Sequence, residues 1–117
     1  IQEIPNHETV GYGRKEALDR DTKIATIRIG YADGLDRKSG NRKGKVWING
    51  KYAPIVGNVC MDLCMVDITG IDAKEGDSVI VFGENLPVLE VAESIDTIPY
   101  EIFTSISPRV KRVYVKE

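Results

Sequence analysis

Seven residues of this 117-residue sequence have side chains or neighbours suited to chemistry. They fall into three stretches: a tyrosine between two glycines, a Gly-Tyr-Ala-Asp-Gly pentapeptide followed by an arginine, and a Cys-Met-Asp tripeptide. Phenols, thiols and carboxylates can act as general acids, general bases or nucleophiles when their surroundings adjust their proton affinity. The candidates are Tyr12, Tyr31, Asp33, Arg37, Cys60, Met61 and Asp62.

Tyr12 is a candidate general acid or base that lies between Gly11 and Gly13. A tyrosine has a pKa of about 10 in a short peptide, so proton transfer near neutral pH requires roughly 4 kcal/mol of extra stabilisation of the phenolate. A neighbouring cation could supply it, and the sequence does not identify one. The alternative role is structural: the glycines free the backbone to turn, and the ring packs against the fold.

Cys60 and Asp62 are also open to two interpretations. Cys60 could act as a nucleophile only beside a positioned base, and His7 is the single histidine of the sequence. The alternative is a cysteine that packs as a small apolar residue. Asp62 is either a satisfied carboxylate at a strand end or a partner that orients an arginine such as Arg37, and the sequence does not separate these roles.

Tyr31 follows a segment with the pattern of a half-buried strand. Apolar and polar residues alternate over residues 22–29, as expected for a strand with one face on a core. Tyr31 would lie at the end of this strand, where Asp33 and Gly34 turn the chain into a polar loop. Functional sites are often built on loops at the ends of rigid elements, although a tyrosine in this position is more often structural.

The remaining segments predict a mainly β fold with helices near the C-terminus. Asn49-Gly50 between two apolar runs predicts a β-hairpin over residues 45–55, because these residues adopt the positive φ angles of a type I′ turn. Strands are also expected at 59–68, 78–82 and 109–115. Helices are expected over 88–95 and after residue 97, the second with Pro99 early in it and Ile102, Phe103 and Ile106 inward. Short strands between Gly and Pro turns favour one domain over residues 1–117, a small β-barrel or sandwich with one or two helices.

Composition makes several functions poor candidates. Sixteen basic and eighteen acidic residues give a net charge of -2, which is too balanced for a protein that binds nucleic acid through its backbone. There is no apolar run of about 18 residues and no secretion leader, so we expect no membrane partner. One histidine and no Cys-x-x-Cys motif leave no zinc site. Cys60 and Cys64 would lie roughly 13 Å apart in a strand, so we expect free thiols and a reducing cytoplasm.

A series of motifs resembles the C-terminal domain of bacterial alanine racemases over essentially the whole chain. Their order and spacing are more specific than any single motif. The resemblance implies that residues 1–117 are the C-terminal part of a larger enzyme whose N-terminal (β/α)8 barrel is absent from this sequence. The motifs are Val10-Gly11-Tyr12-Gly13, residues 27–34 with Arg37, Asn49-Gly50, residues 54–57, Cys60-Met61-Asp62, Gly76-Asp77, Tyr100-Glu101 and residues 109–112.

The resemblance also implies roles for individual residues. Tyr12 matches the catalytic tyrosine, which is the base that removes or returns the α-proton on the L-alanine side. Met61 matches the residue whose backbone N–H binds the substrate carboxylate. The residues that match the lining of the pocket or of its entrance are Tyr31, Arg37, Asn58 and Asp62.

Pyridoxal phosphate is the cofactor that the resemblance implies for the full-length enzyme, and we do not expect this fragment to bind it. The lysine that holds it as a Schiff base lies in the barrel, and no lysine of this chain matches it, so the fragment should be inactive alone. The implied partners are the chain's own barrel, a second subunit in a homodimer and an amino-acid substrate. The implied function is interconversion of L- and D-alanine for peptidoglycan precursors.

Two departures and two alternatives accompany the resemblance. Asn58 stands where many members carry an arginine, and Pro108 where some place a tyrosine that reaches the cofactor phosphate, so neither contact carries over. The alternatives are a racemase for another amino acid, such as serine, and a binding or assembly module that keeps the fold without its chemistry. About 250 further residues with barrel periodicity upstream would exclude the module.

Overall fold

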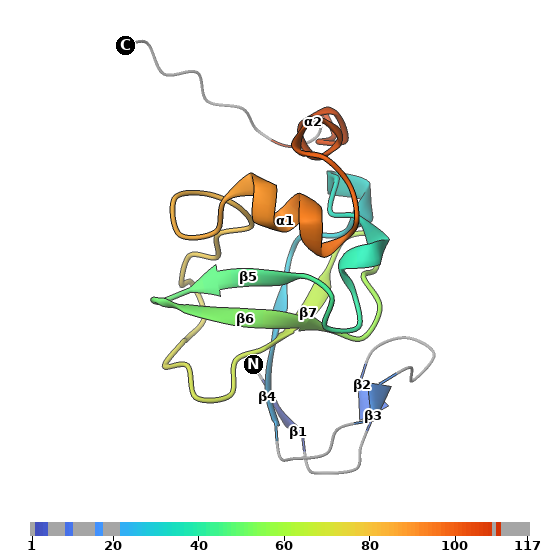
Figure 1. Ribbon diagram of the computed structural model, residues 1–117. Coiled ribbons are helices and arrows are strands. Elements are labelled where there is room, and N and C mark those ends of the chain that lie inside the picture. Colours follow the sequence, from blue (N-terminus) through green and yellow to red (C-terminus); the bar gives the residue numbers. More distant parts are fainter. Residues whose placement is uncertain (1, 5–8, 11–15, 18–21, 109, 111–117) are drawn as a thin grey trace.

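The described residues of the computed structural model form two antiparallel sheets and two short α-helices, so the fold is mainly β as predicted (Figure 1). They are residues 2–4, 9–10, 16–17, 22–108 and 110. The larger sheet has five strands in the order β1-β4-β7-β6-β5, and β2 pairs with β3 in the second. The strands are β1 (Gln2–Ile4), β2 (Thr9–Val10), β3 (Glu16–Ala17), β4 (Thr22–Ile27), β5 (Lys45–Ile48), β6 (Lys51–Val56) and β7 (Cys64–Asp67).

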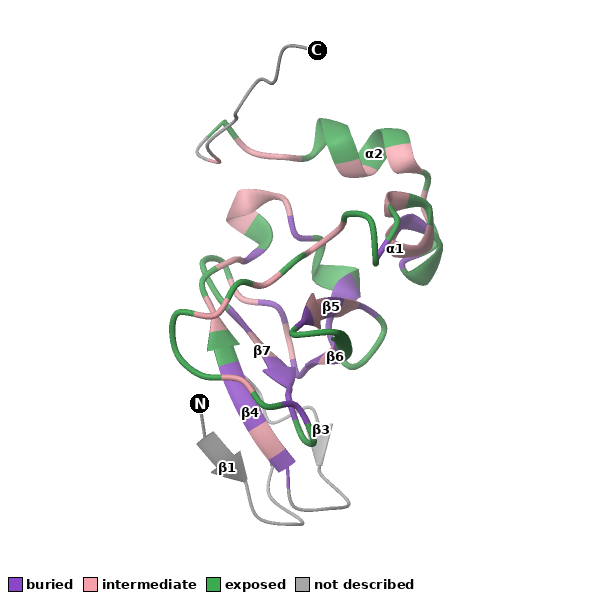
Figure 2. Cartoon of the chain, turned by 90° about the vertical axis from the view of Figure 1, so that its left-hand side faces the viewer, coloured by how far each residue is buried: buried purple, intermediate pink, exposed green. Residues whose placement is uncertain are grey.

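The buried core is built on the central strands of the larger sheet. β7 lies between β4 and β6 and pairs antiparallel with both, so its backbone is hydrogen-bonded on both edges. Figure 2 shows buried residues concentrated in these strands and exposed residues on α2. Truncating one large core side chain typically costs 2–5 kcal/mol, so this layer is the rigid support of the fold. Its most deeply buried apolar residues include Val46, Ala53, Ile55, Cys64, Val66 and Ile68.

The β5–β6 hairpin has the turn that the sequence predicts. Asn49 and Gly50 have φ angles of 47° and 84°, both positive, as a type I′ turn requires. Next to the turn, the rings of Trp47 and Tyr52 meet edge to face across the two strands, with centroids 4.9 Å apart. The hairpin prediction is therefore confirmed.

Both predicted helices are present, as α1 (Val88–Ser94) and α2 (Pro99–Thr104). Pro99 occupies the first turn of α2, where its missing N–H breaks no helical hydrogen bond. The inward orientation expected for Phe103 is wrong, because its side chain is 50% exposed. α2 lies at the surface, and the Phe103 ring packs edge to face against Phe82, with centroids 5.8 Å apart.

The small β-barrel predicted from the sequence is not formed by the residues that the structure describes. β1 and β5 are the two edges of the larger sheet, and the described part of the chain does not join them. The strand expected at 78–82 makes a single bridge, between Ile80 and Trp47, instead of a continuous ladder. A barrel needs continuous pairing around its circumference, so the sheet stays open. The strand expected at 109–115 falls, apart from Val110, outside the described residues.

The segments around the predicted strand ends also differ from expectation. β7 begins only at Cys64, because the N–H of Cys60 donates to the carbonyl oxygen of Leu63 at 3.0 Å and closes a turn. The loop predicted after Gly34 contains a 3₁₀ helix over Arg37–Ser39, capped by the Asp36 carboxylate. These turns leave the residues before β7 free to contact other segments.

Candidate functional site

A turn after β4 lies against the segment before β7 and brings Tyr31 and Met61 together. The chain leaves β4 at Ile27 and forms a 3₁₀ helix over Tyr31–Asp33, and we call residues 30–34 the Tyr31 turn. The Tyr31 N–H donates to the Cys60 carbonyl at 2.9 Å, and the Ala32 N–H donates to the Met61 carbonyl at 3.0 Å. Two hydrogen bonds to consecutive carbonyls fix both the position and the direction of this contact.

Gly30 permits this contact because it has no side chain. A Cβ at this position would lie 2.2 Å from the Cys60 oxygen and 2.4 Å from the Met61 oxygen, which is closer than real Cβ atoms come. Its φ angle of -146° is extended and open to any residue. Glycine is therefore needed here for the close approach of two backbones, not for an unusual backbone conformation.

Asp33 closes the Tyr31 turn and ties it to a third segment. Its carboxylate accepts the Gly30 N–H at 3.1 Å, and its carbonyl oxygen accepts the Ser107 N–H at 3.1 Å. Gly34, with a φ angle of 114°, lies so close to this segment that a Cβ would come 2.6 Å from the Ser105 oxygen. The sequence did not predict this contact with residues 105–107, although the glycine after Asp33 is a signal of close backbone approach.

The site exposes groups that folding usually buries or pairs. Tyr31 and Met61 are 43% and 53% exposed, although both are large apolar residues. The Met61 N–H makes no hydrogen bond to any residue that the structure describes. The Arg37 guanidinium lies over the Tyr31 ring, 5.6 Å from its centroid, within the range of a cation–π contact. A phenol and a guanidinium therefore lie together on the Tyr31 turn, and the segment that this turn contacts carries an available amide donor.

Asn58 belongs to the same region through the loop that follows Arg37. Its side-chain oxygen accepts a hydrogen bond from the Asn41 side chain at 3.3 Å. The Asn41 N–H donates to the Gly57 carbonyl at 2.8 Å, which holds the loop on the end of β6. Asp62 is exposed directly after Met61. Of the predicted pocket residues, Tyr31 and Arg37 thus contact each other, Asn58 contacts the loop after Arg37, and Asp62 follows Met61 in the chain.

Tyr12 and His7 lie outside the described residues. Tyr12 is the predicted catalytic base, and His7 is the single histidine that could serve Cys60 as a base. Their predicted roles remain predictions.

Cys60 and Cys64 are both free thiols, as predicted, but the spacing argument behind that prediction is wrong. Cys60 lies in the turn before β7 and is half-buried, whereas Cys64 begins β7 and is fully buried. Burial, followed by the neighbouring Cys60, raises the pKa of Cys64 to about 12. This thiol stays protonated near neutral pH and packs as a small apolar residue.

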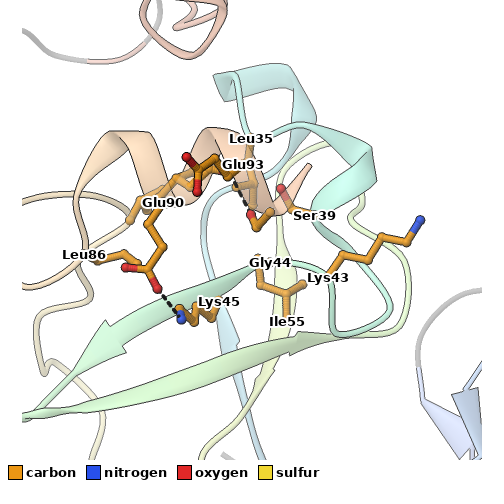
Figure 3. Close-up of a pocket in the computed structure, with 12 residues that line it drawn as sticks. Leu35, Ser39, Lys43, Gly44, Lys45, Ile55, Leu86, Glu90 and Glu93 are labelled. Carbon is orange, nitrogen blue, oxygen red and sulfur yellow. Dashed lines mark hydrogen bonds and ion pairs between the residues drawn. The ribbon is translucent and has the colours of Figure 1, made fainter. Parts of the chain in front are cut away.

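A separate pocket lies between α1 and the β5–β6 hairpin and contains none of the predicted site residues (Figure 3). Its volume is about 320 Å³. Lys45 and Glu90 meet across it with an N–O distance of 2.7 Å, and the Lys45 ammonium also lies 4.1 Å from the centroid of the Tyr52 ring. Because these charges already have partners within the chain, we assign the pocket no function.

The described residues contain neither a cluster of metal-binding side chains nor a membrane-spanning helix. No three or more His, Cys, Asp or Glu side chains within the described ranges group together as a metal site would require. None of the helices in this part of the chain is long and apolar enough to cross a membrane.

Residues 1–114 match the family described as alanine racemase, C-terminal domain. Among curated proteins, the chain is 50% identical to "Alanine racemase" of Clostridium novyi (strain NT), covering 99% of this chain and 31% of that protein. It is 46% identical to "Alanine racemase 1" of Caldanaerobacter subterraneus subsp. tengcongensis, covering 97% of this chain and 30% of that protein. The chain therefore spans about a third of the length of the curated relatives it matches.

Solved structures give the same result for the fold. The crystal structure of alanine racemase from Bartonella henselae, with covalently bound pyridoxal phosphate, superposes with a TM-score of 0.91 at 41% identity, covering 97% of this chain and 32% of that one. Biosynthetic alanine racemase from Pseudomonas aeruginosa superposes with a TM-score of 0.92 at 35% identity, covering 98% of this chain and 32% of that one. The described fold thus corresponds to one part of these longer chains.

Proposed function

The chain belongs to the family of alanine racemase C-terminal domains, and on that premise we propose that it forms part of a longer enzyme that interconverts L- and D-alanine. The observation in the structure that carries this proposal is the Tyr31 turn, which holds the Cys60 carbonyl and leaves the Met61 N–H with no partner among the described residues. The relatives compared above are named alanine racemases, which favours alanine over serine as the substrate and an enzyme over a non-catalytic module.

The proposed arrangement places residues 1–117 after an N-terminal (β/α)8 barrel in the same polypeptide. The relatives, about three times as long as the matched region, support a large preceding or following part. We further propose a homodimer in which this domain completes the active site of the other subunit. The exposed Tyr31 and Met61 support a surface that meets another part of the enzyme, since large apolar groups are usually covered in the working protein.

Met61 is proposed to bind the substrate carboxylate through its backbone N–H. Both enantiomers of alanine carry this carboxylate, so one amide donor can serve the reaction in both directions. A hydrogen bond to a charged carboxylate is about twice as strong as one between neutral groups, and a backbone donor cannot change its rotamer. The Met61 amide therefore orients the substrate while its α-carbon changes configuration.

Tyr12 is proposed as the base that takes the α-proton on the L-alanine side. Racemisation needs proton-transfer groups on opposite faces of the α-carbon, so a second group must come from outside this chain's site. Tyr31 would line the pocket beside the substrate. Arg37, held over the Tyr31 ring, together with Asn58 and Asp62 would line its entrance.

Pyridoxal phosphate is proposed as the cofactor of the whole enzyme, held outside this chain. None of the described lysines is buried, whereas a lysine that carries a carbonyl cofactor is normally kept from water. The residues around the Tyr31 turn therefore do not fit the attachment of the cofactor, which we assign to the barrel. When bound there, it withdraws electrons from the α-carbon and makes the α-proton more acidic. The free thiols agree with a cytoplasmic enzyme.

The test is exchange of the α-proton of each alanine enantiomer into deuterated water, followed by NMR with the full-length enzyme and its Tyr12→Phe variant. We expect exchange from L-alanine to fall at least 100-fold and exchange from D-alanine to fall less, because a removed general base costs roughly 10²–10⁴ in rate. The isolated 117-residue chain should show no exchange and serves as the blank. If Tyr12→Phe exchanges both enantiomers as fast as the wild-type enzyme does, Tyr12 has a structural role.

A further inference from the structure

The peptide unit between Cys60 and Met61 is held at one end and available at the other. Its carbonyl oxygen accepts the Tyr31 N–H at 2.9 Å, whereas its N–H, that of Met61, has no partner among the described residues. A trans peptide is planar, and its N–H points opposite to its carbonyl. The hydrogen bond from Tyr31 therefore fixes the direction of the Met61 N–H, away from the Tyr31 turn, and polarises it as a donor.

Asp33 holds the Tyr31 N–H in this position. Its carboxylate accepts the Gly30 N–H at 3.1 Å, and its own N–H donates to the Gly30 carbonyl at 3.0 Å, so Gly30 and Asp33 are bonded twice with Tyr31 between them. The Ser107 N–H, at 3.1 Å from the Asp33 oxygen, anchors the same residue to the segment after α2. The turn is thus closed from within and supported from outside.

From this geometry we propose that Asp33 is a positioning residue for the substrate carboxylate. It closes the Tyr31 turn, the turn holds the Cys60 carbonyl, and the planar peptide presents the Met61 N–H to the carboxylate. The proposal rests on the proposed function, in which that N–H binds alanine. In this proposal Asp33 acts through the turn and not by contact with the substrate. Its loss should therefore weaken binding of both enantiomers equally and leave the proton-transfer steps nearly unchanged.

The turn over residues 74–77 offers a matched control. The Asp77 carboxylate accepts the Lys74 N–H at 3.0 Å, and the Asp77 N–H donates to the Lys74 carbonyl at 3.1 Å. This is the same pair of bonds over the same spacing as in the Tyr31 turn. The Asp77 carboxylate also accepts the Asn49 side chain at 2.9 Å, which places this turn against the β5–β6 hairpin turn. Asp77→Ala removes the same kind of bond at a different place.

The experiment compares Asp33→Ala, Asp33→Asn and Asp77→Ala in the full-length enzyme. We expect Asp33→Ala to raise the KM for L- and D-alanine about tenfold, with kcat within about twofold, because one well-oriented bond to a charged group is weakened. Asp33→Asn keeps a neutral acceptor, so its KM should rise about threefold. Asp77→Ala should leave both constants unchanged. Amide hydrogen exchange, followed by mass spectrometry, should accelerate about tenfold over residues 30–34 in Asp33→Ala alone.

Three outcomes would overturn the proposal. One is faster exchange over residues 30–34 with an unchanged KM, since the turn would then open without affecting binding. Another is unchanged exchange over residues 30–34, whatever the activity. The third is a fall in kcat with no change in KM, or an effect on one enantiomer only. If Asp33→Ala does not fold, Asp33→Asn carries the same comparison. A wild-type enzyme that does not racemise alanine contradicts the proposed function instead, and the exchange data still test Asp33.

Discussion

The turns over residues 30–34 and 74–77 are closed by the same hydrogen bonds but have different surroundings. In the first, a Cβ on Gly30 would lie 2.2 Å from the Cys60 oxygen. In the second, a Cβ on Gly76 would have no atom within 4 Å, and glycine is needed there because the φ angle is 92°. One local pattern therefore does two different things. At residues 74–77 it reverses the chain. At residues 30–34 it also positions a second segment, Cys60–Met61, through backbone hydrogen bonds.

The largest effect should come from replacing Gly30 with alanine. Gly30→Ala pushes a methyl group into backbone oxygens that cannot move away independently, so we expect roughly 2–4 kcal/mol lower stability. Activity of the full-length enzyme should fall at least 100-fold, because the Met61 amide is displaced. Denaturant unfolding and racemisation assays measure the two effects.

Gly76→Ala is the control for that substitution. The positive φ angle at Gly76 should make alanine cost about 1 kcal/mol, with no loss of activity. Wild-type stability in Gly30→Ala would show that the two backbones are not in close contact. An activity loss in Gly76→Ala as large as in Gly30→Ala would remove the distinction between the turns.

Sequence reasoning succeeded where a feature depends on neighbouring residues alone. The hairpin turn follows from the backbone preferences of Asn49 and Gly50, and α2 begins at Pro99 because proline suits that position. The resemblance supplied the candidate site residues, whose roles stay predictions. These are local or inherited patterns, and packing elsewhere does not have to be known to see them.

The contact between the Tyr31 turn and Cys60–Met61 could not be predicted in this way. Apolar residues alternate from Val59 through β7, and this alternation predicts one continuous strand over the whole segment. The turn at Cys60–Leu63 breaks that strand, and its neighbours from the Tyr31 turn satisfy the freed carbonyls. Such long-range bonds override local preference, as the open sheet and the bridge at Ile80 also show.

The two cysteines offer a second test of where the segment before β7 leaves the core. The thiol of Cys64 has its pKa raised from 9.0 to about 12 by burial, so the unfolded chain releases this proton at lower pH than the folded chain. The folded state then binds more protons, and the free energy of unfolding falls as pH rises. We expect a fall of roughly 1–2 kcal/mol between pH 9 and 10.5.

Cys64→Ala should lose this part of the pH dependence and provides the reference, because lysines and tyrosines also titrate in that range. Unfolding curves at each pH give the difference between the two proteins. Iodoacetamide at pH 8 should modify Cys60 in the isolated chain and spare Cys64. Equal labelling of the two thiols would mean that Cys64 is not buried at the start of β7.

The smallest effect concerns Asp77, the carboxylate of the more exposed turn. Hydrogen bonds from the Lys74 N–H and the Asn49 side chain hold its pKa below the ordinary value of 3.8. A carboxylate with a lowered pKa in the folded state stabilises the fold above its unfolded pKa, and this contribution is lost as pH falls through the folded value. An NMR titration of the Asp77 side-chain carbon should therefore show a midpoint below 3.8, and Asn49→Ala should move it upward. A midpoint at or above 3.8 would mean that this carboxylate does not close the turn, and Asp77→Ala would no longer match Asp33→Ala.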